Sequence, residues 1–159
     1  MHTTRAMTLN FVLKPESVAL TSAATKQDVL ERMAAVFAEA WALDAATVLE
    51  ALEERERLGS TGFGRGVAIP HARIPGIRRP IAALLKPAKP VPFESADGLP
   101  VELVFGLLSP ENCGAMHLHA LAAVSRIVRD ERMHEALTDA SDPEALYSLL
   151  TNVTDRDAA

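Results

Sequence analysis

The segment 100–108 (PVELVFGLL) constrains the fold more than any other part of this sequence. It is almost entirely apolar and is bounded by a proline, so it predicts a β-strand that is buried on both faces of its sheet. A sheet of this kind needs helices on each side. Further strands are predicted at 80–85 and at 67–69, where Pro70 ends the pairing, and the apolar piece 17–20 is expected to add an edge strand.

Helical patterns lie on both sides of these strands in the sequence. Apolar residues recur at helical spacing over 26–40, and a second helical pattern ends near Gly59. The predicted helices follow Thr25, Asp44, Gly114 and Asp142. The order of two helices, a group of strands and two more helices predicts an α/β fold.

Length and composition predict a single globular, soluble domain. The chain has 159 residues, of which 48% are hydrophobic, and this length is sufficient for a core without disulfides or metals. Its net charge of −5 argues against a surface for nucleic acid or anionic membranes. The apolar runs are too short for a signal peptide or a membrane span, so we expect a cytoplasmic protein. We place the domain at 12–150, with flexible termini at 1–11 and 151–159.

The single cysteine, Cys113, allows neither an internal disulfide nor a cysteine-based zinc site. The histidines and acidic residues show no metal-ligand spacing either, because His117 and His119 point in nearly opposite directions on a helix. No metal site is therefore expected.

A glycine-rich segment, 59–66, is the first candidate for a functional site. Its four glycines let backbone N–H groups approach a ligand closely, and the hydroxyls of Ser60 and Thr61 add donors, which suits an anion. The spacing matches neither a Walker loop nor a dinucleotide-binding loop. A tight turn without any ligand remains the alternative on this pattern alone.

Histidines supply the candidate reactive groups. His71 follows a predicted strand, and a neutral imidazole nitrogen is a competent nucleophile toward a phosphoryl donor near pH 7, whereas the alternative is a histidine that only hydrogen-bonds its loop. His117 lies at the border of an apolar helix face in the first turns, where the helix dipole favours an anion, although it could also bond a carbonyl. Arg55 lies four residues before Gly59 and can reach an anion there, while the charged run 53–57 otherwise predicts a solvated face.

These residues together resemble the active-site signature of the nitrogen-regulatory IIA proteins, in the mannitol/fructose-type IIA family of the bacterial phosphoenolpyruvate-dependent phosphotransferase system. The similarity includes Gly59-Ser60-Thr61-Gly62 and Val67-Ala68-Ile69-Pro70-His71, and it continues through 93–110 and 117–121. It spans about 12–150. Two positions depart from the family pattern, since Ala72 stands where glycine is usual and Arg65 where asparagine is common.

The resemblance implies a mixed central sheet flanked by helices, and a phosphocarrier that uses no metal or organic cofactor. His71 would accept a phosphoryl group from the phosphohistidine of a small HPr-like carrier protein. His117 would support that group by hydrogen bonding, and Arg55 would stabilise its charge. The expected phosphate-binding residues are Gly59, Ser60, Thr61, Gly62 and Arg73.

Three functions remain open at this stage. With no membrane segment and no room for a IIB domain, the resemblance favours a stand-alone regulatory protein of nitrogen, potassium or carbon metabolism, acting on targets such as kinases or transporters. A soluble fructose- or mannitol-specific IIA component that passes phosphate to a IIB domain is the second. The third is an interaction module that is never phosphorylated. A small-molecule-binding domain is less favoured, because it would need a deeper apolar pocket.

Overall fold

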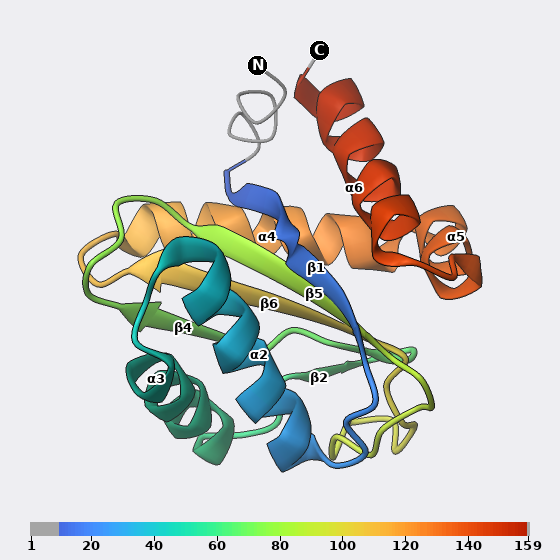
Figure 1. Cartoon of the computed structure of the whole chain (residues 1–159), viewed down its shortest axis with the longest axis horizontal. Helices are drawn as coiled ribbons and strands as arrows, with labels where there is room; N and C mark the ends of the chain where they lie inside the picture. Colours follow the sequence, from blue (N-terminus) through green and yellow to red (C-terminus); the bar gives the residue numbers. More distant parts are fainter. Residues whose placement is uncertain (1–9, 159) are drawn as a thin grey trace.

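The computed structural model describes residues 10–158 and consists of a mixed sheet between two layers of helices (Figure 1). The strands pair in the order β1-β5-β6-β3-β2, and β4 also pairs with β6. β1 with β5, β3 with β6 and β4 with β6 are parallel pairs, whereas β5 with β6 and β2 with β3 are antiparallel. Their bounds are β1 Val12–Thr21, β2 Gly62–Gly64, β3 Val67–Ala68, β4 His71–Ile74, β5 Ile81–Pro87 and β6 Leu103–Pro110. The α/β prediction is confirmed.

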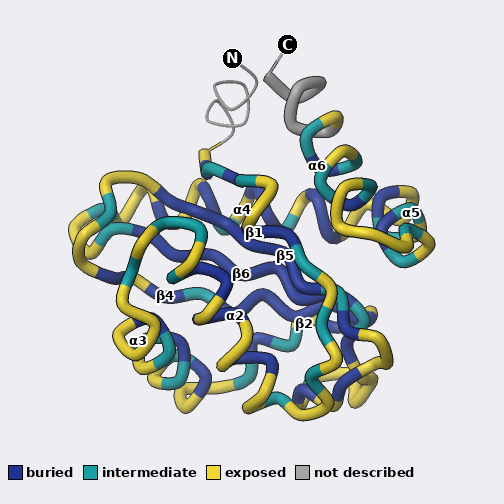
Figure 2. Tube along the Cα trace, in the orientation of Figure 1, coloured by how far each residue is buried: buried dark blue, intermediate teal, exposed yellow. Residues whose placement is uncertain are grey.

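β6 is the central strand that its apolar sequence predicts, and alternate residues serve two separate cores. Leu103, Phe105 and Leu107 pack with α4, α5 and α6, while Val104 and Leu108 pack with α2 and α3. The buried sheet therefore lies between exposed helix surfaces (Figure 2). The helices are α2 Lys26–Trp41, α3 Ala45–Arg57, α4 Gly114–Arg129, α5 Glu131–Asp139 and α6 Pro143–Ala158.

Side-chain caps define where the helices begin. Thr25 Oγ1 accepts the Asp28 N–H at 3.0 Å before α2, and Asp44 Oδ2 accepts the Thr47 N–H at 3.0 Å before α3, as the sequence predicts. α5 was not predicted. It starts at a third cap, in which Asp130 Oδ1 accepts the Met133 N–H at 3.1 Å. Lys86 Nζ donates to the carbonyls of Thr138 and Ala140 and so satisfies the end of α5.

One long strand explains where His71 lies. β6 pairs first with β3, through Leu103 opposite Val67, and then with β4, through Leu107 opposite His71. Pro70 interrupts the neighbouring chain between these two pieces, so the prediction that pairing ends at this proline holds only locally. His71 therefore opens a second short strand beside β6, at a margin of the sheet near the end of α3 (Figure 1).

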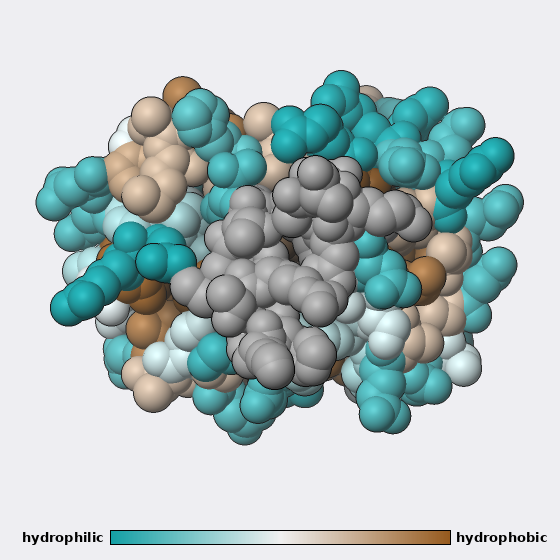
Figure 3. All heavy atoms as spheres, turned by 90° about the horizontal axis from the view of Figure 1, so that it is seen from above, coloured by the Kyte–Doolittle hydropathy of each residue, from teal (hydrophilic) through white to brown (hydrophobic). Residues whose placement is uncertain are grey.

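The described structure extends beyond both predicted boundaries of the domain, which stay a prediction. Phe11 is buried in the core, and the backbone of α6 continues as helix from Pro143 to Ala158. Residues 1–9 lie outside the described part, so flexibility of the termini stays a prediction. Across residues 10–158, no helix is long and apolar enough to cross a membrane. Seen from above, the described surface is largely hydrophilic with separate apolar patches (Figure 3).

Candidate active site

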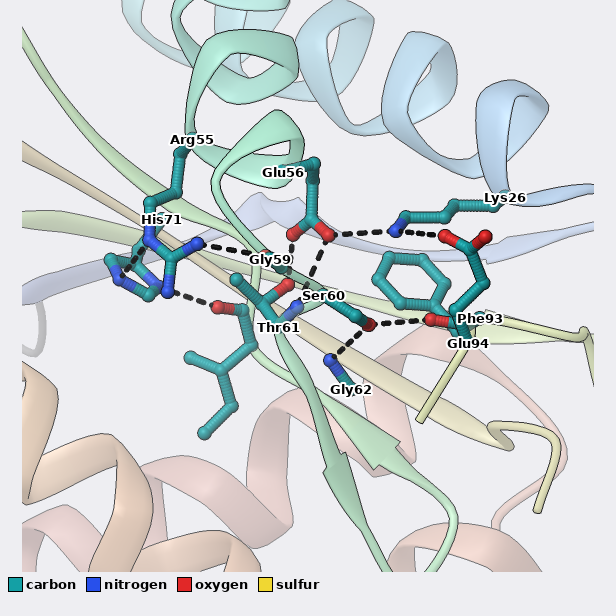
Figure 4. Close-up of polar contacts among 11 residues, drawn as sticks. Lys26, Arg55, Glu56, Gly59, Ser60, Thr61, Gly62, His71, Phe93 and Glu94 are labelled. Atoms are coloured by element: carbon teal, nitrogen blue, oxygen red, sulfur yellow. Dashed lines mark hydrogen bonds and ion pairs between the residues drawn. The ribbon is translucent and has the colours of Figure 1, made fainter. Parts of the chain in front are cut away.

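The two nitrogens of the His71 ring have different partners (Figure 4). Nδ1 lies 2.7 Å from the carbonyl oxygen of Ile69, which can only accept, so this nitrogen carries the proton. Nε2 lies 3.3 Å from Nε of Arg55 and accepts the guanidinium N–H. The lone pair of Nε2 therefore faces the Arg55 guanidinium, which the sequence predicts as a site residue.

His71 is a neutral base in this environment. Burial lowers the pKa of its imidazole below the ordinary value of 6.5, and the positive charge of Arg55 lowers it further. The hydrogen bond to Ile69 and the negative charge of Glu56 oppose this change without reversing it. An unprotonated Nε2 is the form required of a nucleophile near pH 7.

His117 comes from α4 and turns inward, as its position on the helix predicts. Its side chain is buried, and its ring centroid lies 5.6 Å from that of His71. Burial, followed by the nearby His71 and Arg73, lowers the pKa of His117 to about 4, so this ring is also neutral near pH 7. Nδ1 of His117 lies 2.7 Å from the hydroxyl oxygen of Ser109, which is fully buried at the end of β6.

Arg55 and Arg73 supply positive charge from two directions. Arg55 Nη1 donates to the Gly59 carbonyl at 2.8 Å, so one guanidinium connects the glycine-rich segment with His71. Arg73 is exposed two residues along β4 from His71, on the same side of the strand, and its charge acts on His117. The structure thus gathers His71, His117, Arg55 and Arg73 at one place.

Several donors of the glycine-rich segment are already bonded to other protein groups. The N–H groups of Gly59, Thr61 and Gly62 donate to Glu56 O, Glu56 Oε1 and Ser60 Oγ, at 3.1, 3.1 and 2.9 Å. The Ser60 hydroxyl donates to the Phe93 carbonyl at 2.6 Å, and the Thr61 hydroxyl donates to Glu56. These contacts shape the segment, and its expected contacts with phosphate stay a prediction.

Glu56 is the main correction to the sequence analysis at this site. The charged run 53–57 predicts a solvated face, but Glu56 is buried, and its carboxylate also pairs with Lys26 Nζ at 2.9 Å. Its charge acts on His71 against that of Arg55. Within residues 10–158, no group of three or more His, Cys, Asp or Glu side chains is placed to hold a metal ion.

The sequence that forms this site matches a known protein family over most of its length. The family model for the phosphoenolpyruvate-dependent sugar phosphotransferase system, EIIA 2, matches residues 11–153. The chain belongs to this EIIA family.

Individual relatives place the chain near the nitrogen-regulatory members of the EIIA family. A nitrogen regulatory protein from Bradyrhizobium diazoefficiens is 42% identical over 126 residues, covering 79% of this chain and 82% of the relative. The crystal structure of IIA-Ntr from Neisseria meningitidis has a TM-score of 0.79 at 34% identity, covering 87% of this chain and 95% of that one. A fructose-specific EIIA component from Haloferax volcanii is 32% identical over 133 residues, covering 83% of this chain and 86% of the relative.

Two polar residues of the candidate site were not predicted from the sequence. Ser109 is the single hydroxyl in the otherwise apolar strand β6, a signal that could have drawn attention to it. Glu56 gave no such signal, because it stands among other charged residues of α3 and only its tertiary partners show that it is buried.

Proposed function

We propose that this chain is a regulatory phosphocarrier, and that Nε2 of His71 accepts a phosphoryl group from the phosphohistidine of an HPr-like protein. The observation that carries the proposal is the orientation of the His71 ring. Its Nδ1–H is bonded to Ile69 O at 2.7 Å, which leaves the Nε2 lone pair beside the Arg55 guanidinium.

The transfer needs no proton to move. The lone pair of His71 Nε2 forms a new N–P bond while the N–P bond of the donor phosphohistidine breaks, and the donor imidazole leaves with that electron pair. His71 keeps its Nδ1 proton, so the phosphorylated ring is cationic and its hydrogen bond to Ile69 O persists. Transfer of this kind depends mainly on positioning and on charge stabilisation, which the surrounding side chains supply.

Each neighbouring group has a distinct role in this proposal. The Arg55 guanidinium, now donating to Nε2, would move its donors to the oxygens of the arriving phosphoryl group. His117, whose Nδ1 is engaged by Ser109, would donate from Nε2 when the Ser109 hydroxyl donates to Nδ1. Arg73 adds long-range positive charge from β4.

The names of the relatives favour a regulatory role for this chain rather than a role in sugar transport. The nitrogen regulatory relative shares 42% identity and the fructose-specific one 32%. We therefore infer that the phosphorylation state of His71 controls target proteins in the cytoplasm, such as kinases or transporters. The fructose-specific relative supports a second candidate function, in which a IIB domain accepts the phosphoryl group from His71.

Intact-protein mass measurement tests the carrier role. The chain is incubated with phosphoenolpyruvate, the first enzyme of the system and its HPr-like carrier, beside His71→Ala and His119→Ala. His119 is exposed on α4, so its variant serves as the matched control. We expect one acid-labile phosphoryl adduct on the wild type and on His119→Ala, and none on folded His71→Ala. An adduct on His71→Ala, or none on the wild type with an active donor, refutes the proposal. Adding a IIB domain then tests the second candidate.

A further inference from the structure

Glu56 is a buried carboxylate near the proposed phosphoryl acceptor His71. A carboxylate has no hydrogen to donate to phosphoryl oxygens, and its negative charge repels them. Its side chain is 5% exposed. Three donors converge on it, namely the Thr61 N–H at 3.1 Å, the Thr61 hydroxyl and Lys26 Nζ at 2.9 Å (Figure 4). A buried ion pair is weak support for stability by itself, since apolar residues often replace one without loss. The position of this carboxylate therefore points to another use.

The contacts of Glu56 join the end of α3 to the glycine-rich segment. The Gly59 N–H donates to the Glu56 carbonyl at 3.1 Å, while the Glu56 side chain holds Thr61 two residues further along. Arg55 Nη1 donates to the Gly59 carbonyl at 2.8 Å, between these two attachments. The orientation of the Arg55 guanidinium consequently depends on a stretch of backbone that Glu56 fixes at both ends.

Lys26 compensates the charge that this arrangement brings close to the site. Its ammonium group lies 2.9 Å from Glu56 and 3.0 Å from Glu94, and 4.9 Å from the centre of the Phe93 ring. The Ser60 hydroxyl donates to the carbonyl of the same Phe93, so the segment is attached on this side too. Pairing with this ammonium group lets the Glu56 carboxylate serve as a fixed acceptor while reducing its repulsion of an incoming phosphoryl group.

We propose that Glu56 is a positioning residue for phosphoryl transfer, which fixes segment 58–61 through Thr61 and Lys26 so that the Arg55 guanidinium faces Nε2 of His71. This inference rests on the proposed phosphocarrier function. It assigns Glu56 no contact with the phosphoryl group and makes its effect depend on Arg55.

A double-mutant cycle measures that dependence. The rate of phosphoryl uptake is compared in the wild type, Glu56→Gln, Arg55→Gln and the double variant. Glu54→Gln is the matched control, because it removes the same charge from an exposed position of the same helix. We expect Glu56→Gln to be about 10- to 100-fold slower, as misplacement of a charge-stabilising group predicts. In the Arg55→Gln background the same substitution is expected to change the rate by less than about twofold.

The outcomes separate this inference from the proposed function. If the wild type takes up no phosphoryl group, the carrier role fails. If Glu56→Gln and Glu54→Gln both label at the wild-type rate, only the positioning role fails. If Glu56→Gln is slow and its effect multiplies that of Arg55→Gln, Glu56 acts independently of Arg55 and the inference is overturned.

A milder variant covers the possibility that Glu56→Gln does not fold. Thr61→Val removes one donor to Glu56 and keeps the backbone N–H. We expect slower uptake, together with a broadened or shifted Nε–H resonance of Arg55 in NMR spectra of the folded protein. Wild-type uptake with an unchanged Arg55 resonance in Thr61→Val would contradict the role assigned to Glu56.

Discussion

The imidazole rings of His71 and His117 lie with their centroids 5.6 Å apart, at an interplanar angle of 40°. One comes from the margin of the sheet and the other from the helix that covers one face of it. In each ring a protein oxygen engages Nδ1, from Ile69 at 2.7 Å and from Ser109 at 2.7 Å. Under the proposed carrier function, this arrangement would let Nε2 of His71 attack phosphorus while Nε2 of His117 supports the transferred group.

This arrangement predicts that His117→Ala slows phosphoryl uptake without abolishing it. The nucleophile His71 and the Arg55 cation remain, but one donor to the phosphoryl oxygens is lost, which typically slows a reaction roughly 100-fold. Timed mass measurements of the adduct give the rate, with His119→Ala as the control on the same helix. Uptake at the wild-type rate would show that His117 has only a structural role.

The low pKa of His117 predicts a pH-dependent stability. Its pKa falls from 6.5 to about 4 on folding, so between these values the unfolded chain binds more protons and the free energy of unfolding decreases as the pH falls. The full shift corresponds to about 3 kcal/mol, and solvent screening leaves about 1–2 kcal/mol. The lowered pKa of His71 acts in the same direction and persists when His117 is replaced.

Denaturant unfolding at pH 7 and pH 4.5 isolates this contribution. His117→Gln is expected to lose less stability between the two pH values than the wild type, while the exposed variant His119→Gln behaves like the wild type. The pKa values of Asp44 and Asp97 are lowered from 3.8. The stability that these carboxylates contribute is therefore lost mainly below pH 4.5, outside the range between these two pH values. An identical pH dependence in His117→Gln would contradict the prediction.

Long periodic elements were predictable from the sequence, and short ones were not. The apolar run of β6 and the caps at Thr25 and Asp44 are local signals, and the structure confirms them. β4 was missed because Pro70 does interrupt the chain, and only the length of β6 lets pairing resume beyond it. The formation of β4 thus depends on its pairing with β6, which the local sequence does not show.

The candidate site divides in the same way. His71, Arg55 and His117 carry chemistry that is visible from residue type and from the resemblance to a family. Glu56 and Ser109 act through burial and through partners that come from other elements, as in the Lys26–Glu56 pair between α2 and α3. Although Ser109 stands out as the one hydroxyl of β6, the sequence does not show which partner either side chain meets, because the fold sets those partners.

Gly106 in the middle of β6 predicts a close approach of helix and sheet. A Cβ at this position would lie 2.6 Å from Met33 Sδ and 3.0 Å from Phe37 Cε2, and both side chains are fully buried in α2. Gly106→Ala should therefore destabilise the protein by about 1–3 kcal/mol through overpacking. Gly114→Ala, with nothing within 4 Å, is the control and should change stability by less than about 0.5 kcal/mol in denaturant unfolding. Equal stability of the two variants would show that α2 can move away freely.

Arg65 occupies a backbone conformation that suits asparagine better than arginine. Its φ of 59° lies in the left-handed region, where asparagine is favoured over arginine. The Arg65 N–H donates to Asp97 Oδ2 at 2.8 Å, a contact that any substitution except proline keeps. Arg65→Asn should therefore raise the free energy of unfolding by about 0.5–1 kcal/mol relative to Arg65→Gln, which removes the same charge without relieving the backbone. Equal denaturant midpoints for the two variants would show that the turn between β2 and β3 tolerates Arg65 without strain.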